Sequence, residues 1–211
     1  GYEKVVLGGW SGGGSLSLFY QDQAVNPTIT QTPAGDPVDL KNAGLIPADA
    51  ILLLAAHVSR SVTMTEWLDP SILDEARPFD RDPELDIYAA DCRYAPPYPP
   101  EFVERFRAAQ IARNRRITSW AKAQLAEIRA SNDPDAERCF VVQGTMCDVR
   151  WLDPEQDRSD RKPGTCYLGD PRIANDGPVG LGRFTTLRSW LSQWSYDESR
   201  ADGLGNASRV F

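Results

Sequence analysis

Residues 5–21 read VVLGGWSGGGSLSLFYQ and join an apolar run, a glycine-rich turn around Ser11 and a helical pattern. The apolar, β-branched residues 5–7 favour a buried parallel strand. The residues from Ser15 onward favour a helix. The order strand, tight turn, helix therefore predicts that Ser11 lies where the carboxyl end of a strand meets the start of a helix.

The turn itself, Gly9-Trp10-Ser11-Gly12-Gly13, matches the pattern G-x-S-x-G. Small residues at both ends allow a sharp strand-to-helix turn, and a strained backbone at the serine exposes its hydroxyl. The N–H of Gly12 then points to where an oxyanion would develop. We predict Ser11 as a catalytic nucleophile and Gly12 as an oxyanion donor. The alternative is a glycine-rich turn with an incidental serine.

A second apolar run, AILLLAA at residues 50–56, is apolar on both faces and predicts another central strand. Residues 25–49 are rich in Pro, Thr, Asp and Gly and predict a loop. Strand, helix and strand in this order indicate an α/β sheet. His57 follows the second strand directly, so we expect it at the same sheet edge as Ser11.

His57 is the only histidine of the chain, so a serine–histidine mechanism within these residues would have to use it. We interpret it as a structural residue that, together with Trp10, lines the pocket around Ser11. The alternative interpretation is that His57 is the catalytic base.

From residue 58 onward the pattern changes. It predicts a long helix over 101–130, a short strand at 139–142 and a second helix over 183–195. The polar, glycine-containing stretch from Tyr196 to Asn206 predicts a linker. The tetrapeptide Trp-Leu-Asp-Pro occurs at 67–70 and at 151–154 with unmatched flanks, which indicates two similar turns rather than an internal repeat.

The stretch VVLGGWSGGGSLSLFY resembles the nucleophile elbow of the α/β-hydrolase superfamily. The segments PAGDPVDLKNAGLIPADAILLLAAH and RFTTLRSWLSQWSYDESRADG are similar to parts of bacterial hydrolases with a large helical cap. The resemblance implies a partial α/β-hydrolase core, built from the nucleophile strand, elbow, helix and next parallel strand, with a large, mostly helical cap insertion. The expected parts are a core at 1–57, a cap at 58–196 and a linker that returns to the core at 197–211.

The resemblance also implies the chemistry. Ser11 would be the nucleophile and Gly12 one oxyanion donor, whereas the acid and histidine of this superfamily follow later in the chain and the second oxyanion donor precedes the elbow. We therefore expect an internal fragment that lacks the acid and base. The expected function is a serine hydrolase acting on a small-molecule acyl substrate, a carboxylic ester above all. The alternative is a non-catalytic module, a pseudo-hydrolase or inactive fragment, that binds a small molecule or a partner.

Composition and net charge argue against several other classes of function. The net charge of −7 and the lack of a long basic block argue against nucleic-acid binding, and no run reaches the roughly 18 apolar residues of a membrane span. One histidine and four cysteines without a C-x-x-C pair predict neither a metal nor a cofactor. Four reduced and mostly buried thiols in a cytoplasmic protein are the favoured interpretation, and a Cys139–Cys147 disulfide is the alternative.

The charged candidates outside the turn have structural interpretations. The Arg113–Arg116 cluster could contact an anionic substrate, but salt bridges to the acidic loops are favoured. The acidic candidates Asp69, Asp91, Asp170 and Asp197 are each expected on a solvated loop.

Overall fold

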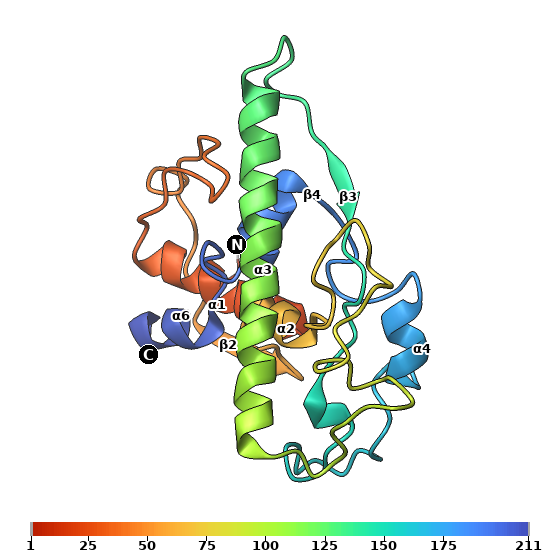
Figure 1. Ribbon diagram of the computed structural model, residues 1–211. Helices are drawn as coiled ribbons and strands as arrows, with labels where there is room; N and C mark the ends of the chain where they lie inside the picture. Colours follow the sequence, from red (N-terminus) through yellow and green to blue (C-terminus); the bar gives the residue numbers. More distant parts are fainter. Residues whose placement is uncertain (1, 211) are drawn as a thin grey trace. The chain divides into compact units, whose positions relative to one another are not determined.

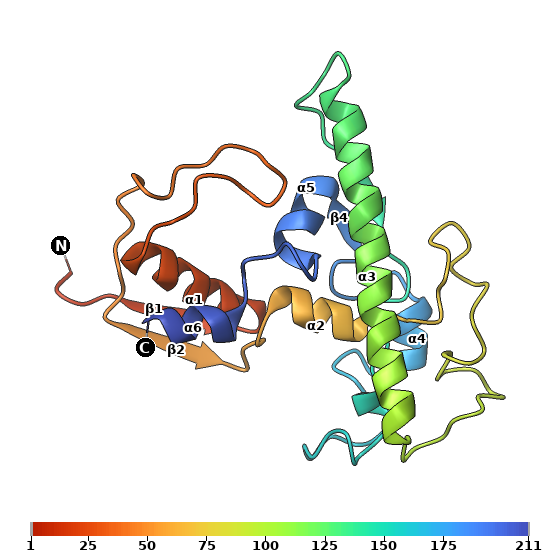
Figure 2. The same ribbon diagram turned by 60° about the vertical axis from the view of Figure 1, so that its left-hand side comes forward.

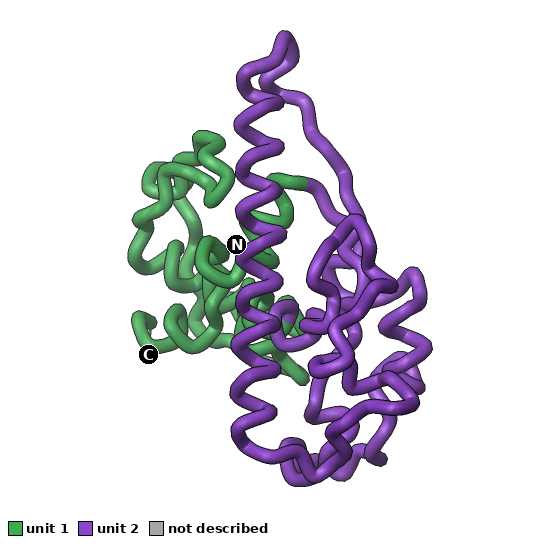
Figure 3. Tube along the Cα trace, viewed as in Figure 1, with its two compact units in different colours: residues 1–63, 187–211 green, residues 64–186 purple. Residues whose placement is uncertain are grey.

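The computed structural model describes residues 2–210 and divides the chain into two compact units (Figure 3). Unit 1 comprises residues 1–63 and 187–211, and unit 2 comprises residues 64–186. Helices and two small sheets occur together, so the fold is mixed α/β at this coarse level.

Unit 1 contains the strand–helix–strand order that the sequence predicts. β1 (Val6–Trp10) and β2 (Ala50–Leu54) pair in parallel, with Gly8 opposite Leu52 (Figure 2). α1 (Gly12–Val25) connects the turn after β1 to the loop that leads to β2 (Figure 1). β1 continues to Trp10 rather than ending at the glycines. The turn at Ser11 therefore follows the last paired residue of the strand directly.

The predicted loop at 25–49 is confirmed as irregular chain that side chains of α1 hold in place. The Gln23 Oε1 atom accepts hydrogen bonds from the N–H groups of Thr28 and Ile29, at 3.0 and 3.1 Å. Gln21 bonds both the carbonyl and the N–H of Ala48, at 3.0 and 2.9 Å. These bonds satisfy backbone N–H and carbonyl groups of the loop that have no partner in a helix or a sheet.

β2 differs from the prediction of a strand buried on both faces. Leu52, Leu53 and Leu54 are each about half exposed, at 52%, 46% and 49%. The sheet of unit 1 has two strands in the described chain, so β2 forms an edge.

The prediction of a linker at 197–211 is wrong for much of the segment. α6 (Gly203–Val210) lies beside α1 (Figure 2). The Gly203 N–H donates to the Val58 carbonyl at 2.7 Å, and Arg209 Nε pairs with the buried carboxylate of Asp22 at 3.0 Å. A segment with weak intrinsic helix propensity thus becomes a helix because tertiary contacts hold it.

Unit 2 is organised around α3 (Pro100–Arg129), which confirms the predicted long helix. Phe102, Phe106, Ile117, Ala121 and Leu125 are buried along it. The shorter elements are α2 (Arg60–Trp67), which begins in unit 1, η1 (Val149–Trp151) and α4 (Pro171–Asp176).

The predicted strand near 139–142 is confirmed as β3 (Cys139–Val141), but the predicted helix at 183–195 begins too early. Its first residues form β4 (Phe184–Thr186), antiparallel to β3, before α5 (Leu187–Ser189) and the π-helical turn η2 (Trp190–Trp194). Two consecutive threonines favour the extended conformation, and pairing with β3 supplies its hydrogen bonds. Phe184, in β4, is 67% exposed.

The two Trp-Leu-Asp-Pro segments do form similar turns. In each, the aspartate Oδ1 accepts the N–H two residues later: Asp69 from Ser71 at 3.0 Å and Asp153 from Glu155 at 2.9 Å. The Trp67 and Trp151 rings contact each other, with centroids 5.2 Å apart. The repeated tetrapeptide thus makes two aspartate-stabilised turns that meet in the core of unit 2.

All four cysteines are free, so the Cys139–Cys147 disulfide does not form. Cys139 is exposed in β3 opposite Thr186, whereas Cys147 and Cys166 are buried. The favoured interpretation of four thiols is confirmed, although only two of them are buried.

Candidate active site

Ser11 adopts the strained backbone that the G-x-S-x-G pattern requires. Its φ and ψ are 53° and −125°, which mirror the polyproline conformation and are costly for an L-residue. A Cβ atom on Gly9 would lie 2.6 Å from the Gly13 carbonyl oxygen and from the Gly14 Cα. The turn therefore needs glycine at position 9, because the helix backbone passes directly over it.

The second glycine of the pattern has a different role from the one predicted. A Cβ on Gly13 would meet nothing within 4 Å, whereas one on Gly14 would collide with the Ala56 side chain. The close packing between α1 and the end of β2 thus depends on Gly14, one residue beyond the pattern.

The end of β2 is joined to the turn through the main chain. The Ser11 N–H donates to the Leu54 carbonyl at 3.0 Å, and the His57 N–H donates to the Ser11 carbonyl at 2.9 Å. Between these bonds, Ala55 takes a positive φ of 43°. The chain therefore turns sharply at the end of β2 and returns His57 to Ser11.

The side chains of these two residues meet. Ser11 Oγ and His57 Nε2 lie 3.2 Å apart, within hydrogen-bonding distance, and the contact is partly buried. Burial, followed by the positive charge of Arg60, lowers the pKa of His57 below its ordinary value. Both causes favour the neutral imidazole, the form that can accept a proton from a serine hydroxyl.

The other two predicted site residues lie on either side of Ser11. Gly12 is the first residue of α1 and is buried, so its N–H belongs to the helix turn whose donors have no acceptor within the helix. Trp10, the last residue of β1, is 74% exposed. The structure therefore brings Ser11, Gly12 and His57 together, and it leaves the Trp10 ring open to solvent.

Arg60 is a residue of this site that the sequence did not indicate. Its Nη1 lies against Gly12, at the place where a Cβ would be. Its Nη2 donates to Gln193 Oε1 at 3.1 Å, and its guanidinium stacks on the Trp194 ring at 4.4 Å from the centroid. The one available signal was its position three residues after His57.

The Arg113–Arg116 cluster has the structural role that the sequence favoured. The Arg113 side chain is fully buried and pairs with Glu75 through two bonds, at 2.9 and 2.7 Å. Arg116 donates to the Ile72 carbonyl at 2.8 Å. These arginines therefore fasten α3 to an acidic loop.

Of the four acidic candidates, Asp69 contradicts the expectation of a solvated loop. It is fully buried, with Oδ2 bound by Arg81 at 3.1 Å and by the Asn175 amide at 2.7 Å. Asp170 accepts the Arg172 N–H as the N-cap of α4. Asp91 and Asp197 are exposed, as expected.

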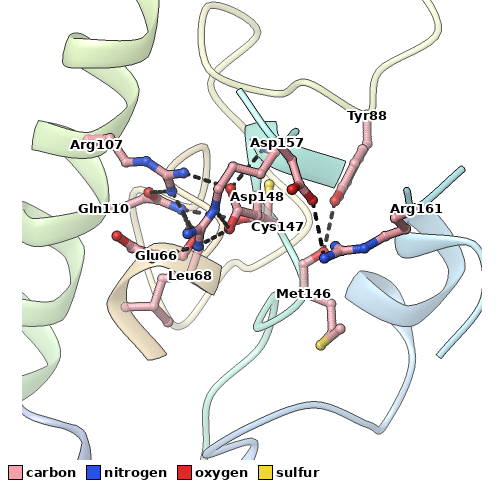
Figure 4. Close-up of polar contacts among 11 residues, drawn as sticks. Glu66, Leu68, Tyr88, Arg107, Gln110, Met146, Cys147, Asp148, Asp157 and Arg161 are labelled. Carbon is pink, nitrogen blue, oxygen red and sulfur yellow. Dashed lines mark hydrogen bonds and ion pairs between the residues drawn. The ribbon is translucent and has the colours of Figure 1, made fainter. Parts of the chain in front are cut away.

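Unit 2 also contains a buried polar network, in which Arg107, Gln110 and Asp148 gather (Figure 4). The buried Asp148 accepts from Arg107 Nη2 at 2.7 Å and from Arg150 Nη2 at 2.6 Å. The neighbouring Cys147 is buried, and this burial, reinforced by nearby carboxylates, raises the pKa of its thiol well above the ordinary value. A thiol held protonated is a poor nucleophile, so this cluster is structural.

A hollow of about 520 Å³ in unit 2 is mostly apolar. Its wall includes Leu73, Ile117, Trp120, Phe140 and Val142, with Glu75 and Arg116 among the polar residues. Ser11, Gly12 and His57 are not among the residues that line it.

Comparison of the chain with protein-family models, with curated proteins and with solved structures finds no match. Within residues 2–210, no three His, Cys, Asp or Glu side chains gather as metal ligands. No helix in this part of the chain has both the length and the apolar character to cross a bilayer. Any assignment of function therefore depends on the geometry around Ser11.

Proposed function

We propose that the chain is a serine hydrolase with an elbow of the α/β-hydrolase type, in which Ser11 is the nucleophile. In a departure from the superfamily pattern, we propose His57, which follows the next strand, as the general base. The observation that carries the proposal is the 3.2 Å approach of Ser11 Oγ to His57 Nε2 at a strained strand-to-helix turn. Strain of this kind, at a residue whose side chain meets a base, is a feature of functional sites. We propose a small-molecule carboxylic ester as the substrate.

In the first half-reaction, the Ser11 Oγ attacks the ester carbonyl carbon while its proton passes to His57 Nε2. The carbonyl π electrons move to the oxygen, and the resulting oxyanion lies at the Gly12 N–H. When the tetrahedral intermediate collapses, the bond to the leaving alcohol breaks, and the His57 imidazolium returns the proton to that alcohol. The product is an ester between the acyl group and Ser11.

In the second half-reaction, water attacks the acyl-enzyme and His57 accepts the proton of that water. Collapse of the second intermediate breaks the Oγ–acyl bond, and the proton moves to Ser11. A free carboxylic acid leaves, and both side chains return to their starting state. The lowered pKa of His57 keeps the imidazole neutral at the start of each half-reaction.

Three further features support the hydrolase class. Ser11 and His57 follow the carboxyl ends of adjacent parallel strands, the edge at which open α/β sheets bind ligands. Gly9 allows the tight passage of the chain over the turn, and the start of α1 favours a developing negative charge. We also propose that unit 2 is the cap of this hydrolase.

Covalent labelling with a fluorophosphonate tests the nucleophile directly. We expect the wild-type chain to be labelled at Ser11, located by mass spectrometry, and Ser11→Ala to lose all labelling. Ser17→Ala, on the same helix, is the matched control and should label at the wild-type rate. His57→Ala should label about 10²- to 10⁴-fold more slowly, the range for loss of a general base.

Two results would contradict this function. Wild-type labelling rates in His57→Ala would show that Ser11 relies on another base. A wild-type chain that is folded by circular dichroism but is not labelled would instead favour the alternative of a non-catalytic module that binds a small molecule or a partner.

A further inference from the structure

Arg60 carries a partly buried positive charge that no carboxylate neutralises within residues 2–210. Its side-chain partners are Gln193, a neutral amide, and the Trp194 ring. Its Nε is buried without a hydrogen-bond acceptor in the described chain. Burial alone lowers the pKa of the guanidinium, and no anion raises it.

Arg107 and Arg113 are arranged differently, whereas Arg183 of unit 2 resembles Arg60 in having buried nitrogens without a hydrogen-bond acceptor in the described chain. Arg113 has Glu75 as its partner, and Arg107 has Asp148, each at 2.7 Å. Leaving a guanidinium partly desolvated without a counter-charge costs free energy, which an anion bound from solution would offset. Arg60 therefore has the electrostatic properties of a binding residue, whereas Arg107 and Arg113 have those of structural residues.

The position of Arg60 ties this charge to the site around Ser11. Nη1 lies against Gly12, the residue directly after the nucleophile, and the same positive charge lowers the pKa of His57. Stacking on Trp194 and the bond to Gln193 hold the guanidinium plane in one orientation. An anion that pairs with this guanidinium would thus lie close to Gly12, the residue that follows Ser11.

We propose that Arg60 makes this site selective for acyl substrates that carry a carboxylate a few bonds from the scissile carbonyl. A planar guanidinium binds a carboxylate through two parallel hydrogen bonds, which fixes both the position and the direction of the acyl chain. This proposal rests on the proposed function of Ser11. It adds a substrate class, the half-esters of dicarboxylic acids, and a residue that selects them.

Two matched esters test the selectivity. One is the mono-para-nitrophenyl ester of glutarate, and the other replaces its free carboxylate with an isopropyl group of the same shape. We expect the wild-type chain to hydrolyse the charged ester with a kcat/KM roughly 10- to 100-fold higher, the range for a charge-assisted hydrogen bond. Arg60→Gln should remove this preference, so that the ratio of kcat/KM for the charged ester to that for the neutral ester falls to about one.

Two further variants distinguish the charge and the planar shape of the Arg60 side chain from the effect of replacing any arginine. Arg60→Lys keeps the charge but loses the planar fork, so it should retain only part of the preference. Arg200→Gln removes an exposed arginine of the same unit and should behave as wild type. Circular dichroism shows whether each variant is folded. Equal hydrolysis of both esters by the wild-type chain, or an equal loss on both in Arg60→Gln, would overturn the proposal.

A binding measurement decides the inference even if Ser11 is not a nucleophile. Calorimetric titration of Ser11→Ala with monomethyl glutarate should show saturable binding, and the double variant with Arg60→Gln should bind at least 10-fold more weakly. If fluorophosphonate labelling fails but this binding is found, the hydrolase function fails and the anion site remains. If labelling succeeds but monomethyl glutarate does not bind, the anion site fails alone.

Discussion

The Ser11 carbonyl accepts a hydrogen bond from the His57 N–H at 2.9 Å, and the side chains of the same two residues approach to 3.2 Å. The two residues are 46 positions apart in sequence. They are therefore joined through the main chain and through the side chains, at the ends of two adjacent parallel strands. This double connection is the basis of the predictions about the site.

The rate of fluorophosphonate labelling should depend on pH through His57. Only the neutral imidazole accepts the serine proton, so the rate should rise with pH and level off above a midpoint. Because burial and Arg60 lower the pKa of His57 from 6.5, that midpoint should lie below 6.5. Arg60→Gln should raise the midpoint, and Arg200→Gln should leave it unchanged. A midpoint above 6.5 in the wild type would contradict the assignment of His57.

The same shift has a consequence for stability. A histidine whose folded-state pKa is lowered binds fewer protons when folded than when unfolded, so stability rises with pH. Its contribution is present above pH 6.5 and is lost as pH falls through the lowered folded-state pKa. His57→Gln should reduce the difference between unfolding free energies measured at pH 7.5 and pH 5.5.

Replacing Ser11 with glycine should give a more stable fold than replacing it with alanine. The Ser11 backbone lies in a region that glycine enters freely and alanine does not, so Ser11→Gly should exceed Ser11→Ala by about 1 kcal/mol in unfolding free energy. At Ser17, inside α1, the order should reverse, because glycine costs about 1 kcal/mol relative to alanine in a helix. Urea denaturation of the four variants measures both differences. The same order at both positions would contradict strain at Ser11.

Glycines 9 and 13 should respond differently to a methyl group. Gly9→Ala places Cβ 2.6 Å from backbone atoms, which cannot move without shifting the helix, and should cost about 1–3 kcal/mol. It should also slow labelling of Ser11. Gly13→Ala meets nothing within 4 Å and adds a good helix former, so it should be neutral or stabilising. Equal effects in thermal unfolding would show that the turn is not packed as described.

In unit 2, two aspartates pair with arginines, but replacing each with asparagine should have very different effects on stability. Asp148→Asn weakens a fully buried carboxylate between Arg107 and Arg150 and should cost about 3–5 kcal/mol. Asp157→Asn alters a surface pair with Arg161, 3.2 Å long, and should change stability by no more than about 1 kcal/mol. Denaturant midpoints measure both. Comparable losses would mean that burial does not set the strength of these pairs.

Much of the turn could be predicted because its constraints are local. An apolar run, a glycine-flanked serine and a helical pattern predict β1, the strained Ser11 and α1, and the structure contains all three. The 30-residue helix α3 was equally clear, because its apolar spacing persists over many turns.

The elements α6 and β4 and the position of Arg60 depend on tertiary contacts, which the spacing of residue types along the sequence does not encode. α6 forms where Arg209 reaches Asp22, 187 residues earlier, and β4 forms because its partner is β3. Ser11 and His57 could be placed at the same edge of the sheet from the sequence, because the carboxyl ends of adjacent parallel strands lie at one edge. The position of Arg60 against Gly12 could not, because it depends on the packing of Trp194 and Gln193 from the far end of the sequence.

The two main-chain bonds of Ser11 have a consequence for how such a site can diversify. They set the distance between serine and histidine from the ends of the strands, independently of the residues 26–49 that connect them. Changes in the length of that connection would alter what surrounds the site while the contact between Ser11 and His57 keeps its geometry. The connecting residues 26–49 can therefore vary in length and sequence, whereas the turn at Ser11 and the end of β2 must keep their geometry.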